Sequence, residues 1–306
     1  MDIVMMLAGL GLLLGGGEGL VRGGVALATR MRLPMAVVGA VVLGFGTSMP
    51  EMLTSISAAL AGAPGIAIGN VLGSNIANIL LILGLAALIA PVTAESAGTE
   101  DRAWLLVATV MGIGVMLVTA TIGRVEGAIL LAALGLYVWR QLSRDEAMEA
   151  VPGVEGMGAG MIAAYVLGGL ATLIAGAWLL VEGATGIARA IGISETVIGL
   201  TVVAVGTSLP ELATSIVAAR RGEAGLALGN ILGSNVFNIL AILGLTAVIV
   251  PIPVPADLST VDLVLVAGSA LLLLAFLALG RIGRGGGALF VAVYAGYVAW
   301  LAVGGA

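Results

Sequence analysis

The sequence lacks cysteine and histidine, and it also lacks lysine, so all 12 of its basic residues are arginine. Without cysteine the chain can form neither a disulfide nor a thiolate ligand for a metal. Without histidine it has no imidazole for zinc binding and no base for the Ser-His pair of a serine hydrolase. No other pairing of a nucleophile with a base is visible, so we expect neither an enzyme nor a bound cofactor.

Charged residues are also scarce. They make up 9% of the 306 residues, whereas a soluble globular domain has about 25%. Hydrophobic residues make up 60%, and uncharged stretches such as 52–94, 156–181 and 224–256 exceed the roughly 20 residues that cross a bilayer. The alternating pattern of membrane β-barrel strands is absent. Because backbone groups in lipid must bond within their own segment, we expect an all-α integral membrane protein.

Charged and Pro/Gly-rich points divide the apolar sequence into segments. The first carries Glu18 and Arg22, which are spaced to form an ion pair, and has no basic residue before its apolar run. We therefore interpret it as a retained helix rather than a secretory signal. In all, the sequence predicts ten transmembrane helices, at 2–28, 34–60, 66–89, 103–119, 127–142, 158–188, 195–219, 225–249, 259–279 and 287–304.

The arginines are distributed unequally between the two sides of the predicted bundle. Two of them, Arg124 and Arg189, fall on one side. Nine fall on the other side, at Arg30, Arg32, Arg102, Arg140, Arg144, Arg220, Arg221, Arg281 and Arg284. The positive-inside rule assigns the larger set to the cytoplasm. Both termini are then expected outside, and the absence of a targeting signal favours the plasma membrane.

The two halves of the chain repeat each other. Residues 46–59 and 206–219 are identical at 10 of 14 positions, and residues 69–85 and 229–245 at 13 of 17. Both pairs keep an offset of 160 residues. Since five helices is an odd number, the second repeat must enter the membrane inverted. We therefore expect two inverted five-helix repeats, 1–142 and 158–306, joined by a cytoplasmic linker at 143–157.

Each repeat places a polar motif inside an apolar helix. In the first repeat, Pro50 lacks an N–H, so the carbonyl of Gly46 loses its helical partner. Thr47 and Glu51 share one face by their helical spacing. Further oxygen groups follow in the first repeat and recur in the second, at Ser48, Asn70, Ser74, Asn78, Thr207, Ser208, Glu211, Asn230, Ser234 and Asn238.

These side chains offer oxygen atoms, and none offers sulfur or imidazole. Hard cations such as Ca²⁺ and Na⁺ prefer oxygen, and Ca²⁺ takes about 6–8 oxygen ligands. Glu51 and Glu211 balance the charge of one divalent ion, whereas Mg²⁺ prefers to keep its waters. Inverted repeats with a site at the bilayer midplane are typical of secondary transporters. The residues thus indicate a carrier of hard cations, with a duplicated bundle that has no substrate as the alternative.

The duplicated pair GTSxPE and GNxxGSNxxN resembles the alpha-repeats of sodium/calcium exchangers in the cation/Ca²⁺ antiporter superfamily. The resemblance covers both repeats and implies Na⁺-driven Ca²⁺ exchange by alternating access. It implies that Glu51 and Glu211 are the central Ca²⁺ ligands, with oxygens from Thr47 and Thr207 beside them. It also implies an inner Na⁺ site lined by Gly44, Ser48 and Ser74, an outer one lined by Ala204, Ser208 and Ser234, and a middle position completed by Asn78 and Asn238.

Asn238 is a departure, because similar exchangers, including the K⁺-dependent branch, can carry an aspartate there. With two acids in a symmetrical pocket, the sequence favours K⁺-independent exchange. The Ca²⁺/H⁺ branch resembles GNxxE rather than GTSxPE, so proton coupling is the first alternative. A cation channel is the second, but it needs a continuous pore, commonly from several subunits. The expected partners are Ca²⁺, Na⁺ and the bilayer; neither nucleic acid nor a required protein partner is evident.

Six polar residues near the motif have a structural interpretation beside a functional one. Asn70 and Asn230 stand close to the start of their helices, where capping or packing explains an asparagine as well as ligand binding does. For these two asparagines the sequence leaves both alternatives open. We expect Thr54, Ser55, Thr214 and Ser215 to bond back to a carbonyl of their own helix rather than to bind an ion.

Overall fold

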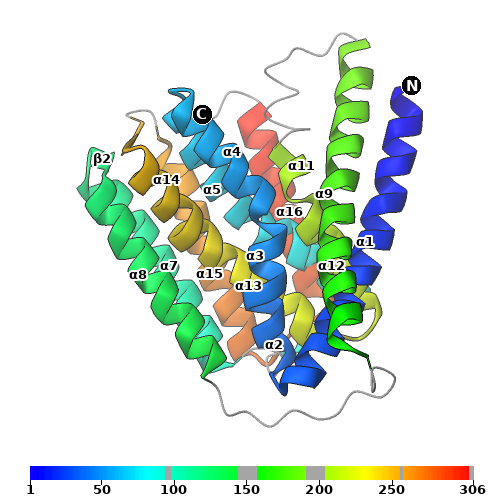
Figure 1. The fold of residues 1–306 in the computed structure, drawn as a ribbon. Coiled ribbons are helices and arrows are strands. Elements are labelled where there is room, and N and C mark those ends of the chain that lie inside the picture. Colours follow the sequence, from blue (N-terminus) through cyan, green and yellow to red (C-terminus); the bar gives the residue numbers. More distant parts are fainter. Residues whose placement is uncertain (94–97, 144–156, 191–203, 256–257, 303–306) are drawn as a thin grey trace.

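The computed structural model describes residues 1–93, 98–143, 157–190, 204–255 and 258–302. Within them the protein is a bundle of long helices, with a few very short strands at the helix ends (Figure 1). Most of the predicted linker and the start of the predicted helix 195–219 lie outside the described residues.

The first half of the chain contains one uninterrupted N-terminal helix, two broken helices and two further straight helices. In chain order they are α1 (Asp2–Met31); α2 (Met35–Val38), η1 (Gly39–Leu43), α3 (Gly44–Thr47) and α4 (Met49–Leu60); α5 (Pro64–Ile76), η2 (Ala77–Leu83) and α6 (Gly84–Ile89); α7 (Thr99–Val118); and α8 (Arg124–Leu142). The elements labelled η are π-helical turns.

The second half follows the same order. Its elements are α9 (Ala159–Ala190); α11 (Ala204–Thr207) and α12 (Leu209–Arg220); α13 (Ala224–Phe237), η5 (Asn238–Leu243) and α14 (Gly244–Ile249); α15 (Thr260–Ala278); and α16 (Arg284–Ala302). In the described part of the chain, seven helical stretches are long and apolar enough to cross a membrane, or eight if the bent stretch 35–60 is one span. The protein is therefore a helical, multi-pass membrane protein.

Two short antiparallel strand pairs connect the halves, and the sequence did not predict them. Strand β1 (Val92–Thr93) pairs with β4 (Arg281–Ile282), and β2 (Thr121–Ile122) pairs with β3 (Ile252–Pro253). Two residues are too few to show the alternation of polar and apolar positions that identifies a strand in a sequence. A shift of 160 residues exchanges the partners of one pair for those of the other, so the two pairs occupy equivalent places in the two repeats.

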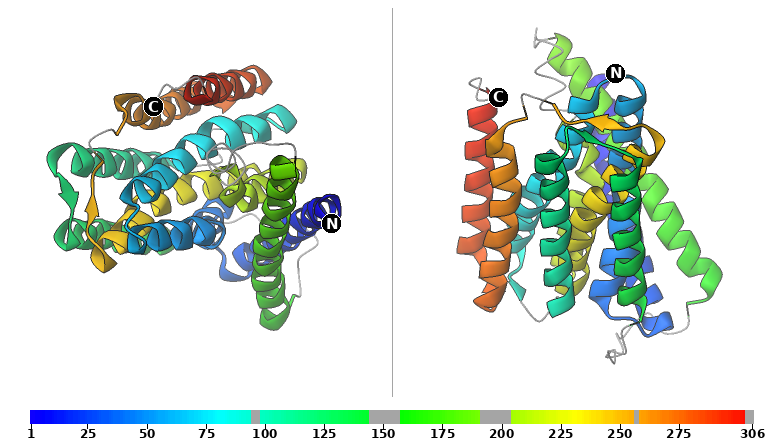
Figure 2. Two further views of the ribbon diagram at one scale, coloured as in Figure 1. Left: turned by 90° about the horizontal axis from the view of Figure 1, so that it is seen from above. Right: turned by 90° about the vertical axis from the view of Figure 1, so that its left-hand side faces the viewer.

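Two helical stretches form the centre of the bundle. In the hydrophobic windows of 64–89 and 224–249, 72% and 89% of the residues are buried, whereas in the other candidate spans the share is 22% to 33%. Figure 2 shows these central stretches between α7 and α8 at one end, α15 and α16 along one flank, and α1 and α9 at the other end. The two GNxxGSNxxN motifs therefore lie on the candidate spans with the largest buried share.

Small residues let the central helices approach closely. A side-chain carbon built on Gly44 of α3 would lie 2.9 Å from the backbone nitrogen of Ser234 on α13, and one built on Gly39 would lie 2.6 Å from the carbonyl oxygen of Leu226. Close backbone approach at small residues is the usual way in which membrane helices pack. The glycines thus bring the first half's broken helix against the second half's central helix.

Helices α1 and α9 lie side by side (Figure 1), and the face where they pack contains several glycines, here called the glycine seam. A side-chain carbon on Gly9 would lie 2.6 Å from the nitrogen of Leu180, and one on Gly16 would lie 2.8 Å from the nitrogen of Leu173. In the opposite direction, Gly169 of α9 approaches the backbone of α1 equally closely. The two helices therefore pack backbone to backbone over several turns.

The predicted ion pair on α1 is confirmed, and it has a second partner. Arg22 Nε donates to Glu18 Oε1 at 3.0 Å. Arg221 Nε, at the end of α12, donates to Glu18 Oε2 at 2.8 Å. This charged contact links α1 to the connection between α12 and α13, a contact that the spacing within α1 could not reveal.

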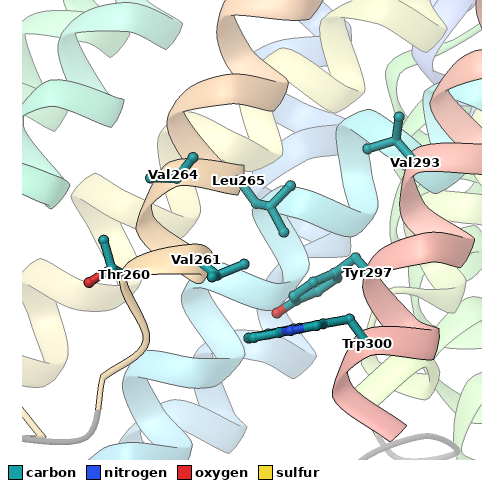
Figure 3. Close-up of a pocket in the computed structure, with 7 residues that line it drawn as sticks. All are labelled: Thr260, Val261, Val264, Leu265, Val293, Tyr297 and Trp300. Carbon is teal, nitrogen blue, oxygen red and sulfur yellow. The ribbon is translucent and has the colours of Figure 1, made fainter. Parts of the chain in front are cut away.

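A cavity of about 370 Å³ opens between α15 and α16 (Figure 3). Its aromatic side consists of the stacked rings of Tyr297 and Trp300, whose centroids are 6.2 Å apart. Tyr297 donates its hydroxyl to Asp262 Oδ1 at 2.8 Å. The lining contains none of the predicted site residues; it consists of Thr260, Val261, Val264, Leu265, Val293, Tyr297 and Trp300. The candidate site therefore lies elsewhere, in the polar centre of the bundle.

Candidate cation-binding site

Two helix breaks position the glutamates, as their prolines predict. The helix that ends at Thr47 resumes at Met49, and the two parts are bent by 42°. In the second half, α11 ends at Thr207 and α12 begins at Leu209. Each new helix carries a proline in its first turn, where the missing N–H costs no helical hydrogen bond. Glu51 and Glu211 therefore occupy the first turn of a helix that begins deep within the bundle.

The two glutamates are held by serines from opposite halves. Ser48 Oγ donates to Glu211 Oε1 at 3.1 Å, and Ser208 Oγ donates to Glu51 Oε1 at 3.0 Å. Glu51 is 1% exposed and Glu211 is fully buried. These four predicted site residues, separated by about half the chain, are thus brought together at one place. A shift of 160 residues exchanges one contact for the other.

Several buried polar atoms around this centre have no protein partner within the described residues. They are the second carboxylate oxygens of Glu51 and Glu211 and both amide atoms of Asn78 and of Asn238. A buried acceptor without a partner costs about 1–3 kcal/mol, and more if it is charged. A hard cation would satisfy these oxygens and neutralise the carboxylates. The residues present therefore fit Ca²⁺ or Na⁺ as a bound and transported ion.

Thr47 directly precedes Ser48, the residue that donates to Glu211. Its side chain is fully buried. Its hydroxyl donates to the Leu43 carbonyl at 2.9 Å and lies 3.3 Å from Asn230 Oδ1. Thr207, its counterpart, ends α11 next to Ser208. The structure thus places a threonine oxygen of the first half in contact with an asparagine of the second.

The structure shows a hydrogen bond between a residue predicted to line the inner Na⁺ site and one predicted to line the outer Na⁺ site. Ser234 donates its hydroxyl to the Gly44 carbonyl at 3.4 Å, although these residues were expected at the outer and inner sites, respectively. Ser74 donates to the Asn70 carbonyl of its own helix. Ala204 is the first residue of α11. Gly44 and Ser234 therefore belong to one neighbourhood at the centre of the bundle.

Two asparagines have partners that sequence reasoning left undecided. Asn70 Nδ2 donates to the Glu51 carbonyl at 3.0 Å and to Ser55 Oγ at 2.9 Å. Asn230 Nδ2 donates to Ser215 Oγ at 3.1 Å. Each asparagine thus donates to the serine that stands four residues after a glutamate. The sequence signal for these two bonds was that the asparagine and the serine are 15 residues apart in both repeats.

The expectation of a bond back to the same helix is wrong for Thr214, whose buried hydroxyl has no partner within the described residues, and for Ser55. The Ser55 hydroxyl donates to the Ala67 carbonyl of α5 at 3.4 Å and accepts from Asn70. The side chain faces α5 because α4 and α5 pack side by side after a tight turn at Gly62. The Ser55 hydroxyl therefore bonds to a carbonyl of the neighbouring helix instead of one on its own helix.

The remaining predicted asparagines lie in widened helical turns. Asn78 is in η2, which begins at Ala77, and Asn238 begins η5. π-helical turns within α-helices occur frequently at functional sites. They leave no pattern in the sequence. Asn70, Ser74 and Asn78 are four residues apart, as on one face of an α-helix, but the α-helix ends at Ile76, before the last of the three.

Comparison with known proteins connects this arrangement to one family. Residues 1–143 and 161–303 match the family model described as sodium/calcium exchanger protein. The inner membrane protein YrbG of Escherichia coli K12 is 35% identical over 98% of this chain and 95% of its own length. The sodium/calcium exchanger MaX1 of Methanosarcina acetivorans is 31% identical over 97% of both chains. A solved structure of the sodium-calcium exchanger NCX_Mj, soaked without Na⁺ and Ca²⁺, shares 35% identity over 98% of both chains with a TM-score of 0.85.

Proposed function

The chain belongs to the sodium/calcium exchanger family, and on this premise we propose how it exchanges Na⁺ for Ca²⁺ across the membrane. Glu51 and Glu211 bind the two ions in turn at one central site. The site opens alternately to each side of the membrane as the protein changes state. Each set of bound ions stabilises the two states to a different extent, and this difference drives the transition.

The observation that carries the proposal is the crossed pair of serine–glutamate contacts. Each carboxylate uses one oxygen to accept from a serine of the other half and keeps the other oxygen without a partner in the described structure. A closed structural pair would satisfy all of its oxygens. Two buried carboxylates with open acceptors instead match the charge of one Ca²⁺ or two Na⁺.

The neutral oxygens complete the proposed ion sites. Thr47 and Thr207 add ligands beside the glutamates, and Asn78 and Asn238 complete the middle position. Gly44, Ser48 and Ser74 line the inner Na⁺ site, and Ala204, Ser208 and Ser234 line the outer one. This assignment follows the family motif position by position. The buried amides of Asn78 and Asn238, which have no partner within the described residues, support it.

We also propose the membrane topology that the sequence predicts. Ten spans form two inverted repeats, 1–142 and 158–306, joined by a cytoplasmic linker at 143–157 in a protein of the plasma membrane with both termini outside. The exchanged strand pairs and the crossed serine–glutamate contacts support a two-fold relation between the halves, because the same offset interconverts each pair. The arginine distribution supports the orientation.

Exchange is proposed to be independent of K⁺. The fully buried Asn238 stands where the K⁺-dependent branch can carry an aspartate, so the centre holds two acids and a neutral amide. Two carboxylates suffice for one Ca²⁺, and K⁺ would add a charge without a matching third acid. Proton coupling and a cation channel are the alternatives that the experiment below separates.

The test is uptake of radiolabelled Ca²⁺ into proteoliposomes preloaded with Na⁺, with K⁺, or with a pH gradient alone. We expect saturable uptake with internal Na⁺, at a rate that external K⁺ does not change. Uptake driven by the pH gradient would instead show proton coupling. Uptake that needs no internal cation and does not saturate would show a channel.

A further inference from the structure

Asn230 connects the two halves at the edge of the proposed ion site. Its side chain is fully buried and both ends of its amide are used. Nδ2 donates to Ser215 Oγ of α12 at 3.1 Å, within the same half. Oδ1 lies 3.3 Å from Thr47 Oγ1 of α3, in the other half, and accepts from it. The amide therefore bridges α12, on which Glu211 lies, and the threonine that precedes Glu51.

A hydroxyl that binds a cation must direct its lone pairs at the ion, so its single proton must point elsewhere. Thr47 has two acceptors for that proton, the Leu43 carbonyl at 2.9 Å and Asn230 Oδ1 at 3.3 Å. The Leu43 carbonyl lies one turn earlier on the same chain segment. The Asn230 oxygen is on another helix, and the bond from Nδ2 of the same amide to Ser215 fixes its orientation.

We propose that Asn230 is a positioning residue, which holds the Thr47 hydroxyl in the orientation that presents its oxygen to the bound cation. This inference rests on the proposed role of Thr47 as a cation ligand. Asn230 acts through Thr47 and does not itself contact the ion. Because Asn230 belongs to α13, a change in the position of α13 relative to α3 changes the ligand strength of Thr47.

The side-chain type matters for this role. An asparagine offers a donor for Ser215 and an acceptor for Thr47 on one planar group. An aspartate would lose the donor and bring a third negative charge into the buried centre. Asn70 is the equivalent residue of the first half. Its Nδ2 donates to Ser55, which matches the bond from Asn230 to Ser215, and also to the Glu51 carbonyl. It therefore serves as a comparison that shares the asparagine–serine contact.

A double-mutant cycle tests the proposal. Calorimetry of Ca²⁺ binding compares wild type with Thr47→Val, Asn230→Ala and the double variant. We expect each single variant to bind Ca²⁺ about tenfold more weakly, the effect of one lost hydrogen bond or ligand. Because Asn230 acts only through Thr47, the double variant should bind no more weakly than Thr47→Val alone. Asn70→Ala should instead weaken binding by the same factor in the wild-type and Thr47→Val backgrounds.

Ser215→Ala provides a second route if Asn230→Ala does not fold. It removes the group that orients the amide, and we expect a smaller loss of affinity that also disappears in the Thr47→Val background. An Asn230→Ala effect that is equal in both backgrounds, or absent, would overturn the proposal. Unchanged binding in Thr47→Val, with binding lost in Glu51→Gln, would overturn this inference and leave the proposed function standing. Binding retained in both would overturn the proposed function as well.

Discussion

At the scale of single residues, the centre of the protein is defined by what each glutamate oxygen contacts. One oxygen of each carboxylate accepts from a serine of the opposite half, and the other has no partner in the described part of the chain. The serine contacts hold the carboxylates in place without occupying their whole binding capacity. In the proposed function, one oxygen of each positioned carboxylate is therefore available to a cation.

Replacing these serines should weaken ion binding. Ser48→Ala and Ser208→Ala each remove a hydrogen bond to a carboxylate, which contributes about 1.5–3 kcal/mol. We expect apparent Ca²⁺ affinity to fall by roughly tenfold or more in each variant, measured by the concentration dependence of Na⁺-driven Ca²⁺ uptake. Ser57→Ala on the exposed face of α4 is the matched control and should leave the affinity unchanged. Equal behaviour of the three variants would contradict a role for the serine contacts.

The sequence revealed the central acids better than their neighbours. Glu51 and Glu211 were predictable because an acid in an apolar segment beside a proline has few explanations other than a functional one. The pairing of Asn230 with Thr47 was not predictable, since it joins residues 183 positions apart. The partner of Ser55 was misjudged because a serine can bond locally or across helices, and only the packing of α4 on α5 decides between them.

At the scale of secondary-structure elements, apolar length and charged boundaries were sufficient to predict where helices occur. A helix is found in each predicted range within the described residues, although the ends differ by several residues in places. The first helix continues to Met31, and the last begins at Arg284. The π-helical turns and two-residue strands were missed, because both depend on contacts between elements rather than on local composition.

The glycine seam between α1 and α9 gives a prediction at this scale. A methyl group on Gly16 would meet the Leu173 nitrogen at 2.8 Å, so Gly16→Ala must separate the two helices. We expect destabilisation of about 1–3 kcal/mol, seen as a lower melting temperature of the purified protein in detergent. The neighbouring Gly15→Ala adds its methyl group where no described atom lies within 4 Å apart from the backbone of its own helix. It should be neutral, or stabilising by up to about 1 kcal/mol through helix propensity. Equal melting temperatures of Gly16→Ala and Gly15→Ala would contradict a structural role for the glycine seam.

At the scale of the whole molecule, two similar halves face each other across a shared polar centre. The halves are connected by strand pairs at the helix ends, by the crossed serine–glutamate contacts in the middle, and by the α1–α9 seam. The internal offset of 160 residues was readable from the sequence. The sequence did not show which surfaces of the halves pack on each other, because the repeated motifs would be the same for any choice of surfaces.

The proposed inversion predicts opposite exposure for equivalent positions. Ala63 and Glu223 precede α5 and α13 at the same place in the two repeats. In the cysteine-free chain, Ala63→Cys should react with an impermeant maleimide added to intact cells, and Glu223→Cys only after the membrane is opened. Labelling of both variants from the same side would contradict the inverted topology. Reversed labelling would keep the inversion and reverse the assignment of the termini.

The most direct test of the central claim is calorimetric titration of the purified protein with Ca²⁺, in the absence and presence of Na⁺. The account predicts saturable Ca²⁺ binding that Na⁺ competes away, and loss of that binding in both Glu51→Gln and Glu211→Gln, since each removes half of the charge that balances the ion. Ca²⁺ binding that survives in either variant, or that Na⁺ does not affect, would contradict a single site shared by the two glutamates and the two ions.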